Sequence, residues 1–191
     1  MYLFFDTETT GLPRNYDAPA SQVANWPRLV QLAWLLADGH GGELKRHASL
    51  IRPDGFEIPR DAVRVHGIST QVARERGAGI GQVLRAFEED LAAADLVVAH
   101  NASYDAGVLG AEYFRAGRKE SPISSKALVC TMRSSTNFCA LPGGPRGYKW
   151  PTIQELHRKL FGTGFGDAHN AVADVDACAK CFFELKRLAV I

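Results

Sequence analysis

The chain has 191 residues, of which 46% are hydrophobic and 23% charged, and these values are typical of a globular protein that buries a core without disulfides or metal. Its 22 Lys and Arg residues nearly balance 21 Asp and Glu residues, giving a formal net charge of +1. This balance excludes a generally basic surface for clamping duplex DNA, but not a pocket that grips one strand end. No apolar run approaches the ~18 residues of a membrane span, and the first residues predict no secretory signal, so we expect a cytoplasmic protein with no membrane contact.

The first third of the chain predicts three strands. Residues 2–8 begin as a continuous apolar run, which is typical of a strand buried on both faces. A second strand is predicted at residues 29–37 and a third at residues 47–52. The polar loop at residues 12–27 is too long for a simple hairpin turn, which suggests a role over the functional site.

Helices and strands alternate in the rest of the chain. We expect a helix at residues 82–94, a strand at 96–99, a helix from its cap Asn101 to Ala116, a strand at 127–131, a Gly- and Pro-rich loop at 139–151, a helix at 153–161 and a last helix from about residue 167. Three neighbouring strands followed by alternation predict an α/β fold with helices on both faces of a mixed sheet. We expect one domain spanning residues 1–191.

Four cysteines, Cys130, Cys139, Cys178 and Cys181, are predicted to be buried reduced thiols. The spacing Cys178-x-x-Cys181 would suit a metal or redox site. Its flanks instead indicate an amphipathic helix, and no second close pair completes a zinc site.

The first candidate motif is Asp6-Thr7-Glu8, at the end of the first predicted strand. Residues two apart on a strand point to the same face, so Asp6 and Glu8 should project together. Two neighbouring carboxylates repel unless a cation neutralises them, and Mg²⁺ takes oxygen ligands of this kind. Alone, this pattern is better explained as the solvated end of a strand.

The second candidate is Asp105, in the first turn of the helix that follows the strand at 96–99. Val108 and Leu109 lie three and four residues on, which places the carboxylate beside a core-facing pair. The alternative is an ordinary first-turn aspartate stabilised by the helix dipole.

The third candidate is Asp174, at the margin of the apolar stripe of the last helix. Asp176 falls far round that helix and is expected to pair with Lys180 at the surface. His169 precedes Asp174 by five residues, about 140° round an ideal helix, so it reaches the same cleft only from the first turn or entry loop. Otherwise it is a surface or capping histidine.

Together these motifs place four carboxylates and a histidine at three element ends. Carboxylates gathered around two cations are the usual device for cutting phosphodiesters. A histidine, with an ordinary pKa of about 6.5, suits a general base that deprotonates the attacking water. The residues therefore predict metal-assisted phosphodiester hydrolysis.

At these residues the chain resembles the DEDD superfamily of 3′→5′ exonucleases, in its histidine-containing branch. That branch includes the proofreading epsilon subunit of bacterial DNA polymerase III and ribonuclease T. The matching segments are Phe5-Asp6-Thr7-Glu8-Thr9-Thr10-Gly11-Leu12, His100-Asn101-Ala102-Ser103-Tyr104-Asp105, and His169 through Asp174. Val65-His66-Gly67-Ile68 also resembles the segment that precedes the family's first helix.

The resemblance implies a ribonuclease-H-like, five-stranded mixed sheet flanked by helices, and a two-metal exonuclease. It implies that Asp6, Glu8, Asp105 and Asp174 hold two Mg²⁺ or Mn²⁺ ions and that His169 is the general base. By the same similarity, Thr9 and Leu12 contact the 3′-terminal nucleotide, His66 and Ile68 border its base or sugar, and Asn101 and Tyr104 line the path of the strand. Groups near residues 7–9, including Thr7, can bond the terminal sugar or phosphate. For Leu12, Ile68 and Tyr104, core packing is the alternative.

The leading expectation is an exonuclease that acts on the 3′ end of single-stranded or frayed DNA and releases 5′-mononucleotides. An exoribonuclease that trims RNA or oligoribonucleotides is the alternative, because no single residue reports tolerance of the 2′-hydroxyl. A DNA polymerase or another replication or repair protein is a candidate partner. The remaining alternatives are a metal phosphomonoesterase and a catalytically inactive module that only binds nucleic acid. An inactive relative should have lost one of the four carboxylates or the histidine, and all five are present here.

Overall fold

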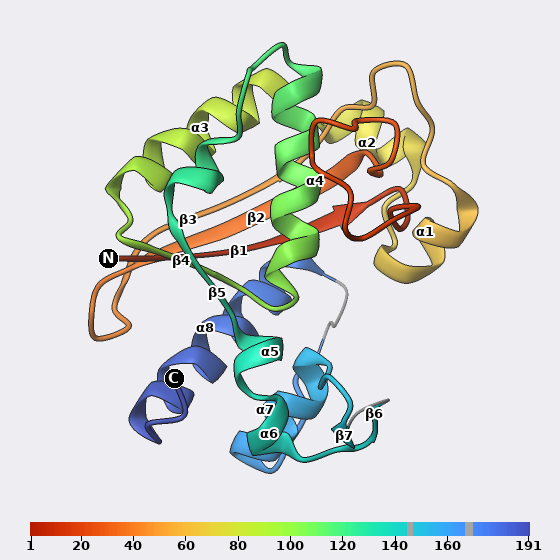
Figure 1. Cartoon of the computed structure of the whole chain (residues 1–191). Coiled ribbons are helices and arrows are strands. Elements are labelled where there is room, and N and C mark those ends of the chain that lie inside the picture. Colours follow the sequence, from red (N-terminus) through yellow and green to blue (C-terminus); the bar gives the residue numbers. More distant parts are fainter. Residues whose placement is uncertain (145–146, 167–169) are drawn as a thin grey trace.

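The computed structural model describes residues 1–144, 147–166 and 170–191. Five strands form the main sheet: β1 (Tyr2–Thr9), β2 (Leu29–Ala37), β3 (Glu43–Leu50), β4 (Leu96–Ala99) and β5 (Ala127–Cys130). The helices are α1 (Arg60–His66), α2 (Thr70–Arg76), α3 (Ile80–Ala93), α4 (Ala102–Arg115), the 3₁₀ helix η1 (Pro122–Ser125), α5 (Thr131–Ser134), α6 (Thr136–Cys139), α7 (Ile153–Phe161) and α8 (Ala171–Arg187). Two short strands, β6 (Pro142–Gly144) and β7 (Gly147–Tyr148), pair with each other away from the main sheet (Figure 1).

The main sheet is mixed, with the strand order β3-β2-β1-β4-β5. β1 pairs antiparallel with β2 along its whole length, from Tyr2 to Thr9. It pairs parallel with β4 only at Tyr2, Leu3 and Phe4. The second half of β1 therefore extends beyond its parallel neighbour, and in open α/β sheets ligands bind at such carboxyl ends.

Helices cover both faces of the sheet (Figure 1), and an apolar cluster fills the space on each side. Leu3 and Phe5 of β1 belong to the cluster that packs against α3 and α4. Phe4 faces the opposite way and packs edge-on against Phe182 of α8, with ring centroids 5.4 Å apart. Because side chains alternate along a strand, β1 is buried on both faces, as its apolar run predicts.

The predicted fold class, a five-stranded mixed sheet flanked by helices, is confirmed. The bounds of β2, β4 and α7 agree with the predicted ranges, while the third strand begins at Glu43 rather than residue 47. Two helices before α3 escaped prediction: α1 and α2. Val65-His66-Gly67-Ile68 therefore does not precede the first helix but ends it, with Gly67 in the left-handed conformation at φ 75°. No helix in the described ranges has the length and apolarity that a membrane crossing requires.

The segment at residues 139–151, predicted to be a loop, contains the β6–β7 pair. It lies beside α5, α6 and α7 at one end of the molecule (Figure 1). His100, directly after β4, connects this region to the sheet. One of its ring nitrogens, Nε2, lies 2.9 Å from the Pro151 carbonyl oxygen, which can only accept, so Nε2 donates. Nδ1 lies 3.0 Å from the Thr131 hydroxyl.

Burial lowers the pKa of His100 from 6.5 to about 4, more than the hydrogen bond to Pro151 raises it. Between pH 4 and 6.5, His100 is therefore neutral in the folded protein but protonated in the unfolded chain. Neutral His100 contributes its full stabilisation above pH 6.5, and this contribution is lost as the pH falls towards 4. We expect this residue to account for about 3 kcal/mol of acid destabilisation. Urea unfolding at pH 7.5 and 4.5 checks this. The difference in the free energy of unfolding between the two pH values should be smaller in His100→Gln than in the wild type. It should be unchanged in His40→Gln, which alters an exposed histidine.

The cysteines are free, and Cys139, Cys178 and Cys181 are buried. Burial raises the pKa of the Cys178 thiol well above its usual value, so this group is an unreactive part of the core. In the described part of the chain, the one side-chain group arranged to hold a metal contains carboxylates only. The prediction of buried thiols is confirmed for these three residues, whereas Cys130, at the end of β5, is only partly buried.

Candidate active site

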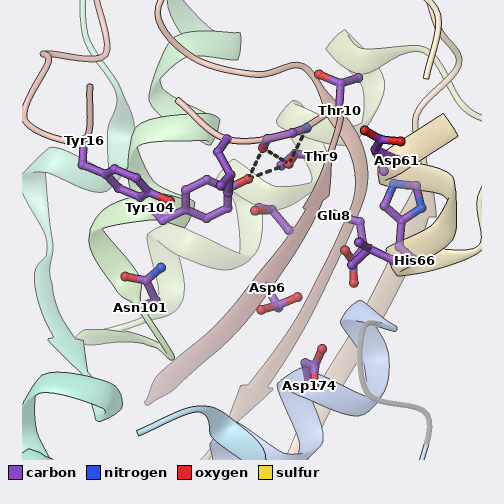
Figure 2. A pocket seen from close by; sticks show the side chains of 15 residues that line it. Asp6, Glu8, Thr9, Thr10, Tyr16, Asp61, His66, Asn101, Tyr104 and Asp174 are labelled. Atoms are coloured by element: carbon purple, nitrogen blue, oxygen red, sulfur yellow. Dashed lines mark hydrogen bonds between the residues drawn. The ribbon is translucent and has the colours of Figure 1, made fainter. Parts of the chain in front are cut away.

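Three carboxylates from two distant stretches of chain meet at the end of β1. Asp6 and Glu8 continue the alternation set by Phe4, so both project on the face that α8 covers. Asp174, in the first turn of α8, approaches them from that helix (Figure 2). One oxygen from each of the three lies within 4.8 Å of the others.

Asp105 reaches the same place from the opposite face of the sheet. It lies in the first turn of α4 and is 2% exposed. Its Oδ1 accepts hydrogen bonds from the Thr7 backbone amide at 3.1 Å and the Thr7 hydroxyl at 2.7 Å. Thr7 is the residue between Asp6 and Glu8, so these bonds fix Asp105 against the acidic pair. A buried aspartate held by β1 is not the solvated first-turn residue that the helix dipole alone would explain.

Thr7, a predicted substrate contact, therefore has a structural partner in addition to its place on the cleft wall. Its backbone amide and its hydroxyl both donate to Asp105, and it is 6% exposed.

The start of α8 differs from the prediction. The helix begins at Ala171 rather than near residue 167, because the side chain of Asn170 accepts a hydrogen bond from the Val172 amide and caps it. His169 lies outside the described residues. Asp176 does not pair with Lys180 as expected: it forms an ion pair at 2.6 Å with Arg46 of β3 and so lies away from the acidic group.

The carboxylates strongly perturb one another. Burial, and then the charges of Asp105, Asp174 and Glu8, raise the pKa of Asp6 well above its usual value. Burial and the charges of Asp174 and Asp105 raise the pKa of Glu8 to about 8. Burial raises the pKa of Asp105 to about 7, although the Thr7 hydrogen bonds oppose this shift. Each shift has the direction expected for a carboxylate that is buried among like charges without a compensating cation, and shifts of this kind cluster at functional sites.

The acidic group opens into a cleft of about 460 Å³. The cleft is lined by residues from β1, the loop that follows it, α1, α4 and α8, as Figure 2 shows. On one wall, the Tyr104 hydroxyl donates to the Gly11 carbonyl oxygen at 2.8 Å and lies 2.5 Å from the Thr9 hydroxyl. These bonds hold the segment after β1 against α4 and present the Tyr104 ring to the cleft.

The structure brings most of the predicted substrate contacts to this cleft. Thr7, Thr9, Leu12, His66, Asn101 and Tyr104 all line it. Leu12 is 72% exposed, so core packing does not explain it. Ile68 does not line the cleft: it is buried with Val30 and Ile58 under α1 and α2, in agreement with the alternative of core packing.

Asn101 corrects a further expectation. It occupies the position before α4 but makes no side-chain capping bond, because its backbone is left-handed at φ 69°. Its side chain faces the cleft instead.

Sequence reasoning missed cleft residues from α1 and from the loop after β1. Tyr16 is half exposed, and its ring lies 6.3 Å from that of Tyr104, extending the aromatic wall. Asp61 and Val65 of α1 form the opposite wall near His66. The unusual length of the loop was a signal for Tyr16, whereas α1 is too short to show a periodic apolar pattern.

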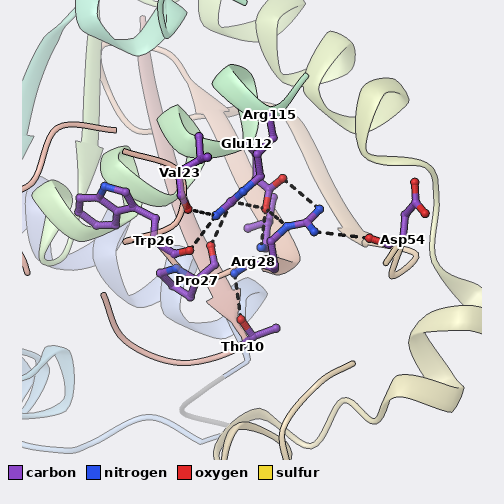
Figure 3. Close-up of polar contacts among 9 residues, drawn as sticks. Thr10, Val23, Trp26, Pro27, Arg28, Asp54, Glu112 and Arg115 are labelled. Carbon is purple, nitrogen blue, oxygen red and sulfur yellow. Dashed lines mark hydrogen bonds and ion pairs between the residues drawn. The ribbon is translucent and has the colours of Figure 1, made fainter. Parts of the chain in front are cut away.

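A buried ionic network fixes the loop at residues 12–27 (Figure 3). Glu112 of α4, 2% exposed, accepts from the Arg28 Nε at 2.9 Å and the Arg115 Nη1 at 2.8 Å. Arg115 also donates to the carbonyl oxygens of Val23 and Trp26, at 2.5 and 2.7 Å. The loop that supplies Leu12 and Tyr16 to the cleft is therefore anchored at its far end to α4.

Close packing reinforces this anchor. The Trp26 ring lies directly over Gly107 of α4, where an added Cβ would be 2.2 Å from the ring. Only glycine admits the indole at this distance.

The donor set fits a hard divalent cation. Carboxylate oxygens are the preferred ligands of Mg²⁺ and Mn²⁺, and neither thiols nor imidazoles of the described residues join the group. Buried carboxylates with raised pKa values gain most from such a counter-charge.

The chain belongs to the RNase_T family of exonucleases, which it matches over residues 3–182. Within curated proteins it is similar to DNA polymerase III PolC-type of Streptococcus suis, with 29% identity over 182 residues, and of Pediococcus pentosaceus, with 24% identity over 190 residues. These alignments cover 95% and 97% of this chain but 11% of each polymerase.

Solved structures show the same fold. Escherichia coli exonuclease I in complex with a dT13 oligonucleotide superposes with a TM-score of 0.75 and 21% identity over 98% of this chain and 42% of that chain. A moderately thermophilic exonuclease I from Methylocaldum szegediense gives a TM-score of 0.73 and 20% identity over 97% of this chain and 40% of that chain. The chain thus spans about two fifths of these exonucleases and a much smaller part of the polymerases.

Proposed function

We propose that the chain is a metal-dependent 3′→5′ exonuclease of the histidine-containing DEDD type, acting as one domain on single-stranded or frayed DNA. The observation that carries this proposal is the convergence of Asp6, Glu8 and Asp174 within 4.8 Å, with Asp105 bonded beside them. Membership of the exonuclease family supports the reaction class. The named relatives, a DNA polymerase and an exonuclease bound to a dT13 oligonucleotide, favour DNA over RNA.

In this proposal the four carboxylates hold two Mg²⁺ or Mn²⁺ ions. When bound, these ions lower the pKa of a water molecule and stabilise the leaving oxygen. His169 accepts the proton of that water as it adds to the phosphorus of the last phosphodiester. The bond from phosphorus to the 3′-oxygen of the penultimate sugar breaks, and that oxygen takes a proton from solvent to become the new 3′-hydroxyl. The terminal nucleotide leaves with its 5′-phosphate.

The remaining cleft residues bind the end of the strand. Exposed Leu12 and half-buried His66, which both line the cleft, can border the terminal base. The Tyr104 ring offers a face on which any base can stack. Contacts of this kind do not read base edges, so the enzyme should degrade strands of any sequence. The similarity to DNA polymerase III PolC-type supports a DNA polymerase, or another replication or repair protein, as a partner.

The test is degradation of a 5′-labelled single strand. With Mg²⁺, we expect a ladder that shortens from the 3′ end and release of 5′-mononucleotides; EDTA should abolish it, and added Mn²⁺ in excess of EDTA should restore it. A matched RNA strand and a DNA strand with a blocked 3′ end are assayed in parallel, to compare the two nucleic acids and to check that degradation starts at the 3′ end. Preferential loss of RNA would reassign the substrate, and activity on small phosphate monoesters alone would contradict the proposal.

A further inference from the structure

Two large aromatic side chains are exposed on the β6–β7 pair and the segment that follows it. Trp150 is 57% and Tyr148 51% exposed. The two other tryptophans of the chain, Trp26 and Trp34, are buried. Large exposed rings two residues apart in the sequence suit a surface that binds a ligand.

The rings border a groove of about 680 Å³, separate from the acidic cleft. We call it the ribbon groove. It is lined by Thr136, Asn137, Gly143, Gly144, Tyr148, Lys149 and Trp150. The lining contains no carboxylate that would repel an anionic chain. It combines aromatic faces, small residues and hydrogen-bonding groups, which suit a chain with planar bases.

Basic groups flank the groove. The Arg133 guanidinium lies over the Trp150 ring, 5.5 Å from its centroid, and within the described ranges it forms no ion pair. The Lys149 ammonium is held by Glu155 at 2.6 Å. Arg133 thus supplies a free positive charge beside an exposed ring, which matches a phosphate next to a stacked base.

The groove is tied to the acidic cleft through residues 100–101. His100 donates to the Pro151 carbonyl oxygen at 2.9 Å and so fixes the residue that follows Trp150. The next residue, Asn101, lines the acidic cleft. The segment at residues 100–101 thus contacts the chain bordering the ribbon groove at one residue and lines the acidic cleft at the next.

We propose that the ribbon groove binds the nucleotides upstream of the 3′ end of a single strand, with Trp150 and Tyr148 stacking on bases and Arg133 contacting a phosphate. This inference rests on the proposed function for the identity of the ligand. It adds a second binding region outside the catalytic cleft, and it predicts that affinity depends on strand length.

Tryptophan fluorescence gives a direct test. Because Trp26 and Trp34 are buried, quenching on addition of an oligothymidylate, with Ca²⁺ in place of Mg²⁺, should report Trp150. We expect quenching by a strand of about twelve nucleotides but not by a trinucleotide, and its loss in Trp150→Phe. Absence of quenching in the wild type despite binding of the labelled strand would overturn the inference.

Steady-state degradation supplies the second measurement. Trp150→Ala and Arg133→Ala should each raise the KM for the longer strand roughly tenfold and leave the KM for the trinucleotide unchanged. Trp150→Phe should restore most of the affinity, and exposed Arg76→Ala on α2 is the matched control. Equal KM values for wild type and Trp150→Ala on the longer strand would contradict the ribbon groove while leaving the exonuclease intact. A wild type that binds the strand with quenching but never shortens it would contradict the exonuclease alone.

Discussion

Replacing Asp174 by alanine is expected to lower the rate of strand degradation by more than roughly a hundredfold, since loss of an outer-sphere partner of a metal ligand alone costs 10–100-fold. Asp174 provides the only carboxylate of α8 in the acidic group, so the change removes the contribution of one whole element. It also removes a like charge that raises the pKa values of Asp6 and Glu8. In the absence of metal, the Asp174→Ala protein should therefore be at least as stable as the wild type. The substitution should lower activity without lowering the free energy of unfolding.

Asp176 is the matched control. It lies two residues further along the same helix and pairs with Arg46 at the surface, where an ion pair contributes little. Initial rates on a labelled single strand with saturating Mg²⁺ compare the variants. Similar losses of activity in Asp174→Ala and Asp176→Ala would contradict the role of Asp174 as a metal ligand.

Replacing Glu112 by alanine is expected to lower the free energy of unfolding by roughly 3 kcal/mol or more. The change leaves Arg28 and Arg115 partly buried and without their shared carboxylate, and it also removes the acceptor of the Leu29 amide at 3.1 Å. Because Arg115 anchors the loop that supplies Leu12 and Tyr16, strand binding should weaken as well.

Urea unfolding at pH 7.5 measures this effect. Glu184→Ala is the control, because Glu184 forms an ion pair of the same i,i+3 spacing with Arg187 on the surface of α8. Its stability should match that of the wild type. A Glu112→Ala protein as stable as the Glu184→Ala control would show that the buried network does not hold the loop.

The sequence was sufficient where a local pattern and its surroundings agree. Residues 29–37 are apolar throughout apart from Gln31 and form β2 as predicted, because the strand is buried on both faces. The alternation on β1 predicted that Asp6 and Glu8 share one face, and the structure agrees. The ordered motifs singled out Asp105 and Asp174, which the structure places beside that pair.

Other features depend on tertiary contacts that no local pattern reports. α1 buries only Ala62, so it has no apolar stripe to reveal it. Asp176 pairs across the fold with Arg46, a partner far away in sequence, instead of the nearby Lys180. Asn101 resembles a helix cap by residue type, yet its backbone conformation directs it to the cleft. Ile68 matched a family segment, but its burial under α2 decides its place.

The central claim is that carboxylates from separate stretches of chain share divalent cations in one cleft. Anomalous diffraction from crystals soaked in Mn²⁺ and a 5′-mononucleotide measures this most directly. We predict anomalous peaks that place Mn²⁺ within bonding distance of carboxylate oxygens of Asp6 and Asp174, with the nucleotide phosphate beside the ions. Peaks elsewhere on the molecule, or none in the cleft at saturating Mn²⁺, would contradict the account.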